Sequence, residues 1–157
     1  RGKPMWMTPE YQKAQENMQP GVITSDGFLG DDTRNILEII NDDEEEMTRL
    51  GIDFDEAADK LRELMTKGRE GLGEPTTVED SWIVQVYEAR GHLPSPFEDG
   101  IFRKVNAQIE YAPERKPSGN TILVSDLSLH LMKKWHFLQG KGSPFRIEPF
   151  QLKKVLP

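Results

Sequence analysis

The clearest pattern in the chain is an apolar stripe with helical spacing over residues 54–67. Asp53 stands three residues before Glu56, which is the spacing of an N-terminal capping box, and Gly68 follows the last turn. We therefore predict a helix over this segment. Its apolar face consists of Phe54, Ala57, Ala58, Leu61, Leu64 and Met65.

Shorter runs of apolar residues at helical spacing predict further helices. Their first turns contain residues that suit a helix start, such as Pro9 and Pro149, or follow a cap such as Ser125. The pattern leaves open whether residues 43–50 continue the helix before them or form a second one. The expected segments are residues 9–18, a helix that begins near Asp31 or Asp32, and residues 43–50, 126–138 and 149–155.

The second half of the chain has the two-residue alternation that is typical of half-buried strands. Val105, Ala107 and Ile109 point one way, and the polar residues between them point the other way. The expected strands are residues 82–87, 102–111 and 121–124, with residues 21–24 and 145–148 as shorter candidates, the latter at a sheet edge.

Short polar connections between consecutive strands favour antiparallel pairing. We expect an α+β fold in which a helical N-terminal half packs on an antiparallel sheet of three to five strands, with a helix near the C-terminus. A single domain over residues 1–157 is expected. It would comprise an N-terminal arm (1–8), a mainly helical part (9–70) and a mainly strand part (71–157) that includes the helix at about 126–138.

Composition narrows the possible chemistry. The 157 residues carry 20 Lys and Arg against 27 Asp and Glu, a formal net charge of -7, and include no cysteine. Disulfides, thiolate nucleophiles, iron–sulfur clusters and cysteine zinc sites are therefore excluded. The sequence has neither an apolar signal segment at its start nor a stretch near the ~20 apolar residues of a membrane span, so we expect a cytoplasmic protein without a membrane partner.

Charge is distributed unevenly along the chain. Residues 1–80 hold 9 basic and 20 acidic side chains, whereas residues 81–157 hold 11 basic and 7 acidic ones. Such asymmetry indicates either two surfaces with different partners or an acidic layer that packs beside a basic one within one fold. Because the acidic half would repel phosphates, nucleic-acid binding through the basic half is the weakest functional hypothesis.

Candidate acid–base chemistry rests on the histidines. His130 and His136 are six residues apart, about 240° around a helix, so they do not form a metal-binding pair. Asp126 and His130 share one helix face, and a histidine near a carboxylate is the usual acid–base pair at neutral pH. The weak catalytic candidates are His92, His130, Asp126 and Arg90, and neither a metal nor a cofactor is expected.

Residues 140–143 (GKGS) resemble a phosphate-binding loop, but they lack the upstream glycine of that motif. They also follow a predicted helix instead of preceding one, so the positive end of the helix dipole points away. The segment is interpreted as a helix end and a turn.

Two further features indicate contact with another macromolecule. An apolar cluster in the N-terminal arm must be buried on its own chain or on a second copy, and a run of five acids offers a landing site for a basic partner. A solvated helix face is the simpler interpretation of the acidic run. The residues concerned are Met5, Trp6 and Met7, and Asp42, Asp43, Glu44, Glu45 and Glu46.

These patterns favour a small bacterial protein that acts without catalysis, by binding another protein or a second copy of itself. The alternative is an enzyme whose histidine and carboxylate site is assembled from distant residues. The weaker alternative is nucleic-acid binding through the basic C-terminal half.

Overall fold

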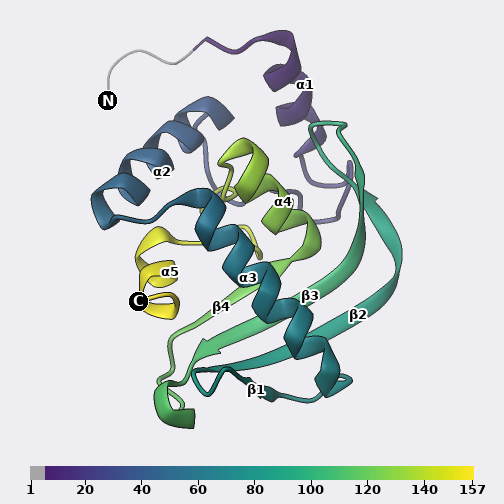
Figure 1. Cartoon of the computed structure of the whole chain (residues 1–157). Coiled ribbons are helices and arrows are strands. Elements are labelled where there is room, and N and C mark those ends of the chain that lie inside the picture. Colours follow the sequence, from purple (N-terminus) through teal and green to yellow (C-terminus); the bar gives the residue numbers. More distant parts are fainter. Residues whose placement is uncertain (1–5) are drawn as a thin grey trace.

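The computed structural model describes residues 6–157, which form five α-helices and one four-stranded antiparallel sheet (Figure 1). The expected α+β class, with helices in the first half and another helix near the C-terminus, is confirmed. The strands pair in chain order and are β1 (Thr76–Val78), β2 (Trp82–Pro94), β3 (Ile101–Tyr111) and β4 (Thr121–Ser125). The helices are α1 (Pro9–Asn17), α2 (Ile36–Leu50), α3 (Phe54–Gly68), α4 (Asp126–Trp135) and α5 (Pro149–Val155).

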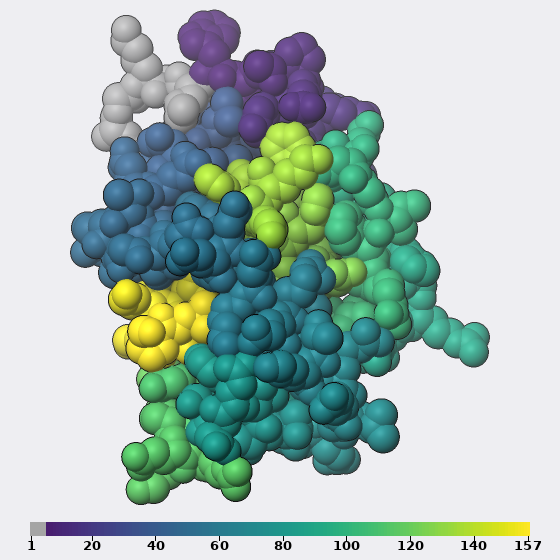
Figure 2. Space-filling view, viewed as in Figure 1, coloured from purple at the N-terminus to yellow at the C-terminus, as the bar shows by residue number. Residues whose placement is uncertain are grey.

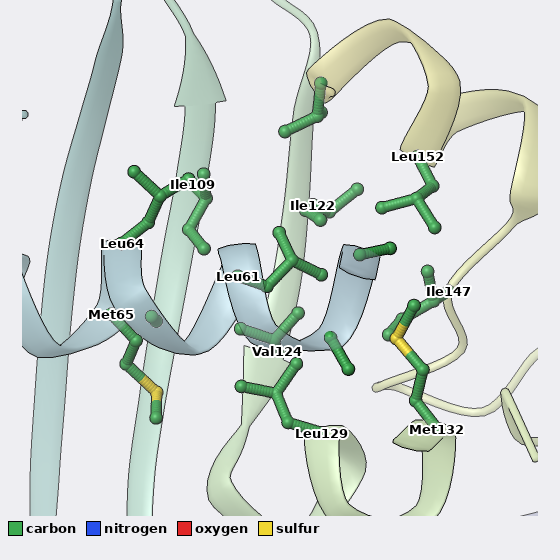
Figure 3. Close-up of a cluster of buried hydrophobic side chains, with 14 of the residues drawn as sticks. Leu61, Leu64, Met65, Ile109, Ile122, Val124, Leu129, Met132, Ile147 and Leu152 are labelled. Atoms are coloured by element: carbon green, nitrogen blue, oxygen red, sulfur yellow. The ribbon is translucent and has the colours of Figure 1, made fainter. Parts of the chain in front are cut away.

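One face of the sheet is covered by helices. Helix α3 runs across β2 and β3, and α4 and α5 pack beside it (Figures 1 and 2). Leu61 and Leu64 of α3, both fully buried, point at strand residues such as Ile109 (Figure 3). Burying one such side chain contributes about 1.5–3 kcal/mol, so this cluster, here called the core cluster, is the main source of stability.

A second group of buried side chains, the N-terminal cluster, lies between α1, α2 and α4. It includes Met18, Phe28 and Ile39. Helix α4 joins the two clusters, because Leu129 belongs to the core cluster and Leu131 to the N-terminal cluster. Met47 of α2 also belongs to the core cluster, and α2 contacts α5, so the N-terminal third of the chain is fixed to the sheet through both α4 and α5.

The helices begin where their caps predict, with one exception. The Asp53 side chain accepts a hydrogen bond from the Glu56 N–H, as expected for α3, and Ser125 forms a capping box at the start of α4. Helix α2 is one continuous helix, but the predicted start near Asp31 or Asp32 is wrong. Asn35 is the cap, while the Asp32 carboxylate is occupied by Arg34.

Other boundaries also differ from the prediction. Residues 21–24 form turns, and residues 145–148 are irregular, because the Arg146 guanidinium is buried against Asp43 and the Ile147 N–H donates to Leu138. Strand β1 was not predicted. Helix α4 ends at Trp135 instead of residue 138, since His136 adopts a left-handed conformation with φ of 53°.

Strand β2 is longer than the predicted 82–87. A bulge between Glu88 and His92 lets it continue to Pro94, and Gly91, with φ of 98°, lies within that bulge. The residues beyond the predicted strand end therefore form half of a long hairpin with β3.

Part of the charge asymmetry is compensated inside the fold. Four acids of the first half pair with side chains of the second half, whereas others, such as Asp32 and Glu79, pair with bases of their own half. The four pairs between the halves are Asp59 with Lys133, Asp43 with Arg146, Asp80 with Arg115, and Glu44 with His136.

Candidate functional site

The predicted acid–base residues do not meet at one place. The His130 Nε2 lies 2.8 Å from the Asp99 Oδ2. Asp126, its expected neighbour on α4, accepts a hydrogen bond from the Arg62 Nη1 at 2.7 Å and another from the backbone N–H of Arg103. Asp126 and His130 do lie on one face of α4, but each of the two side chains is hydrogen bonded to a different partner.

The Asp99 carboxylate contacts several polar side chains. Its Oδ2 accepts from the indole nitrogen of Trp135 at 2.9 Å and lies 3.1 Å from the Lys134 Nζ. Burial opposes ionisation, but the hydrogen bonds from Ser95, Trp135, His130 and Lys134 outweigh it and hold the pKa of Asp99 well below its ordinary range. The carboxylate therefore ties the hairpin end to α4.

The remaining catalytic candidates lie elsewhere. His92 pairs with Arg103 in the β2–β3 register, and its side chain is exposed. Arg90 is exposed in the bulge and makes no ion pair with any residue that the structure describes. Within residues 6–157, no serine or threonine hydroxyl is hydrogen bonded to a histidine, as a nucleophile would be to its base.

The acidic run does not form one patch. Its members point around α2 and most have partners on the same chain: Asp42 pairs with Arg34, Asp43 with Arg146, Glu44 with His136 and Glu46 with Arg49. Asp43 is itself buried. Only Glu45 is exposed without a partner among the described residues, which leaves little charge for a basic partner to contact.

The N-terminal arm is only partly buried. Met5 lies outside the described residues. Met7 packs against the N-terminal cluster, whereas Trp6 is 96% exposed. No residue that the structure describes therefore covers the indole ring.

A pocket of about 310 Å³ lies on the face of the sheet away from α3, and we call it the sheet-face pocket. Tyr87, Asn106 and Ser125 are direct neighbours across β2, β3 and β4. The adjacent residues Val86 and Ala107 point into the core cluster, so this row points to the opposite face. The pocket is lined by residues 24 and 26–28, by 87–89 and 93 of β2, by 103, 104 and 106 of β3, by 125 and 127, and by 139, 144 and 145.

Two loops form the walls of the sheet-face pocket, and glycines bring them together. A Cβ atom at Gly140 would lie 2.2 Å from the Leu29 carbonyl oxygen, and one at Gly30 would lie 2.3 Å from that of Lys141. The Asp31 N–H donates to the Lys141 carbonyl at 2.9 Å. No larger residue allows this approach, so the GKGS segment acts as a packing surface and not as a phosphate-binding loop.

Asp32 fixes the same two loops to each other. Its Oδ2 accepts the backbone N–H of Lys141 at 3.1 Å, and the carboxylate also binds the Arg34 guanidinium. Burial opposes its ionisation, but the hydrogen bonds from Arg34 and Lys141 outweigh it and lower the pKa of Asp32 to about 2.

Most of the exposed surface inside the pocket is apolar, although the lining also includes four charged residues, Asp26, Glu88, Arg103 and Lys104. Phe28 and Leu127 are nearly fully buried in its lining. Gln139 also lines it and is 3% exposed; its Oε1 accepts from the Ser143 hydroxyl at 2.7 Å. The Gln139 amide nitrogen has no hydrogen-bond partner among the described residues, and Lys104 makes no ion pair with any of them. Such an arrangement is typical of a small-molecule site.

Sequence reasoning missed this site. The alternation of β3 placed Asn106 on the outer face correctly, but the walls come from loops that are far apart in the chain. The one local signal was the cluster of glycines at Gly27, Gly30 and Gly140, and a glycine by itself does not say which segment it approaches.

Comparisons with known proteins give no further assignment. Among residues 6–157, no group of three or more His, Asp or Glu side chains is arranged to hold a metal ion. None of the helices in this part of the chain has both the length and the apolar character of a membrane span. No family model, no curated protein and no solved structure matches the chain.

Proposed function

We propose that this protein is a non-catalytic binding module and that its ligand site is the sheet-face pocket. The observation that carries the proposal is the pocket itself, about 310 Å³, whose exposed surface is mostly apolar and whose rim and walls include polar and charged side chains. This volume is at the lower end of the range of ligand sites, so the ligand is small.

The non-catalytic part of the proposal rests on two observations. No serine or threonine hydroxyl of residues 6–157 is hydrogen bonded to a histidine, and neither His130, which pairs with Asp99, nor Asp126 lines the sheet-face pocket. A binding function needs only the shape and the polarity of the pocket.

The test is a titration of ¹⁵N-labelled protein with 1-octanol, a neutral probe with an apolar chain. We expect chemical-shift changes at the backbone amides of Phe28, Ala89 and Gln139. Changes confined to other parts of the molecule, or no changes at all, would contradict the proposal.

A matched pair of variants locates the site. Ala89→Arg places a long charged side chain in the lining and is expected to weaken octanol binding by about tenfold or more, the effect of losing ~1.4 kcal/mol. Gln108→Arg adds the same charge on the same sheet face but outside the lining, and it is expected to leave binding unchanged.

Self-association is a second candidate, favoured by Trp6. This side chain is 96% exposed, and a large apolar group next to a chain terminus is an adhesive contact. Sedimentation velocity of the wild type and Trp6→Ala tests it, with Leu72→Ala as a control at another exposed apolar residue, 90% exposed. A dimer that only Trp6→Ala dissociates supports this function, and a wild-type monomer contradicts it.

A further inference from the structure

We propose that the outer face of the sheet, the face away from α3, is a contact surface between two copies of this chain. The inference goes beyond the proposed ligand pocket, and it places self-association on a different surface from Trp6. It rests on the composition of the outer face and on the hydrogen-bonding groups that the face presents.

The strand register identifies the side chains of the outer face. Val86, Ala107 and Val124 lie side by side across β2, β3 and β4 and belong to the core cluster. Because successive side chains of a strand point to opposite faces, the residues between such positions point outward. The ten outward residues are Thr77 of β1, Ile83, Gln85 and Tyr87 of β2, Asn106, Gln108 and Glu110 of β3, and Thr121, Leu123 and Ser125 of β4.

The outer face carries very little charge. Glu110 is the one acidic or basic side chain among these ten residues, whereas Asp, Glu, Lys and Arg make up 30% of the whole chain. The Glu110 Oε2 accepts the backbone N–H of Gly119 at 2.8 Å, so this carboxylate already has a partner within the chain. Depletion of charged residues is the compositional mark of the centre of a protein–protein interface.

The outer face also holds exposed apolar surface. Tyr87 on β2 is 45% exposed, and Leu123 on β4 is 37% exposed. One row across the sheet lines the sheet-face pocket, namely Tyr87, Asn106 and Ser125. The next row is outside the pocket lining and lies at the middle of the face; it consists of Gln85, Gln108 and Leu123. We centre the contact on this second row.

The charge balance of the chain favours a second copy as the partner. With a formal net charge of -7, two copies repel each other over most of their surfaces, and the nearly neutral outer face is where they approach at the lowest electrostatic cost. A basic or an acidic partner would find only Glu110 to select it on this face.

The chemistry of the outer face suits an identical face. In a two-fold contact the same patch is present on both sides, so each side chain must be compatible with its own copy. Amides and hydroxyls both donate and accept hydrogen bonds, so residues such as Gln85, Gln108 and Thr121 can pair with identical groups. The face has about ten residues, fewer than the roughly 20–30 on each side of a stable complex, so we expect a weak dimer.

The experiment is sedimentation velocity of the full chain from micromolar to millimolar concentration. We expect a dimer that forms as the concentration rises. Gln108→Glu and Gln108→Lys should each weaken the dimer about tenfold or more, because like charges then meet near the two-fold axis. Thr66→Glu, at an exposed residue of α3, is the matched control and should leave the dimer unchanged.

A mixture of the two Gln108 variants in equal amounts makes the test independent of any loss of folding. Opposite charges then meet across the contact, so the mixture should recover the dimer that each variant loses alone. A mixture that stays monomeric would overturn the inference, as would single variants that dimerise like the wild type.

The remaining outcomes separate this surface from the other proposals. A dimer that Trp6→Ala dissociates and the Gln108 variants retain would assign association to the arm and overturn the outer-face contact. A wild-type monomer at every concentration would also overturn it. Neither result affects the proposed ligand pocket, which the octanol titration tests separately.

Discussion

The two faces of the sheet are closed in different ways. On one face, α3 fills the space with regularly spaced apolar side chains such as Leu61 and Leu64, which are fully buried. On the other face, the loops at residues 24–28 and 139–145 cover only one end of the sheet and leave a pocket of about 310 Å³.

The contrast follows from how each element is built. A helix presents its side chains at a fixed spacing, so its apolar stripe packs into a sheet without gaps. The loops meet through backbone contacts between glycines, and those contacts fix the distance between the walls without filling the space beneath them. Stability is therefore concentrated on the helical face, and the proposed binding site lies on the loop face.

The largest expected effect is on the helical face. Leu61→Ala removes a fully buried side chain from the core cluster and should lower the free energy of unfolding by about 2–5 kcal/mol. Urea denaturation measures this change. Octanol binding to the folded protein should be retained, and its loss would show that the two faces are not independent.

A substitution in the loop wall should lower both the stability of the protein and its affinity for octanol. In Gly140→Ala the new methyl group meets the Leu29 backbone at 2.2 Å, and such overpacking costs about 1–3 kcal/mol. Because the walls must separate, octanol binding should also be lost. Gly68→Ala is the matched control, since its methyl group meets Val84 on the helical face at 2.3 Å and should destabilise the protein without affecting the pocket.

Asp32 provides a pH-dependent test of the loop face. The pKa of about 2 in the folded protein is below the ordinary value of 3.8, so the ionised form stabilises the fold above about pH 4. We expect Asp32→Asn to cost about 1 kcal/mol at pH 7, the typical net contribution of one hydrogen bond. Thermal unfolding of both proteins between pH 7 and pH 2 measures the difference. The difference in unfolding temperature between the two proteins should narrow as the pH falls from 4 to 2. A constant difference would contradict the stabilising role of the ionised Asp32 carboxylate.

The smallest effect on stability is expected at the floor of the sheet-face pocket. Tyr87 is 45% exposed, so Tyr87→Ser should change the free energy of unfolding by no more than about 0.5 kcal/mol. It removes an aromatic contact from the lining, and octanol affinity should fall. Unchanged affinity would place the ligand away from β2.

The fold was predictable where its signals are local. Helix α3 has its stripe, cap and terminating glycine within one short segment, and the alternation of β3 identified the buried residues Val105, Ala107 and Ile109. Boundaries were less predictable where a long-range contact decides them. The start of α2 at Ile36 depends on Asp32 being engaged with Arg34 and Lys141.

The candidate site was not predictable from spacing. His130 and Asp126 share a helix face, yet the actual partner of His130 is Asp99, at the end of a hairpin whose length depends on the bulge at Gly91. The pocket depends on two loops that have no common pattern. Sequence periodicity predicts which face of its own helix or strand a residue lies on. It does not predict which residue of another element that side chain contacts.

The contact between Asp32 and Lys141 also has a consequence for the order of assembly. It joins residues 109 positions apart, whereas the long β2–β3 hairpin joins neighbours in sequence. Closing a long segment of chain is entropically more costly than closing a short one, and contacts of high sequence separation slow folding. We therefore expect the hairpin and α3 to form early and the two loops to close last. In the native state the same loops should open first, so that amide hydrogen exchange at Asp31 and Gly140 is faster than at Ile109.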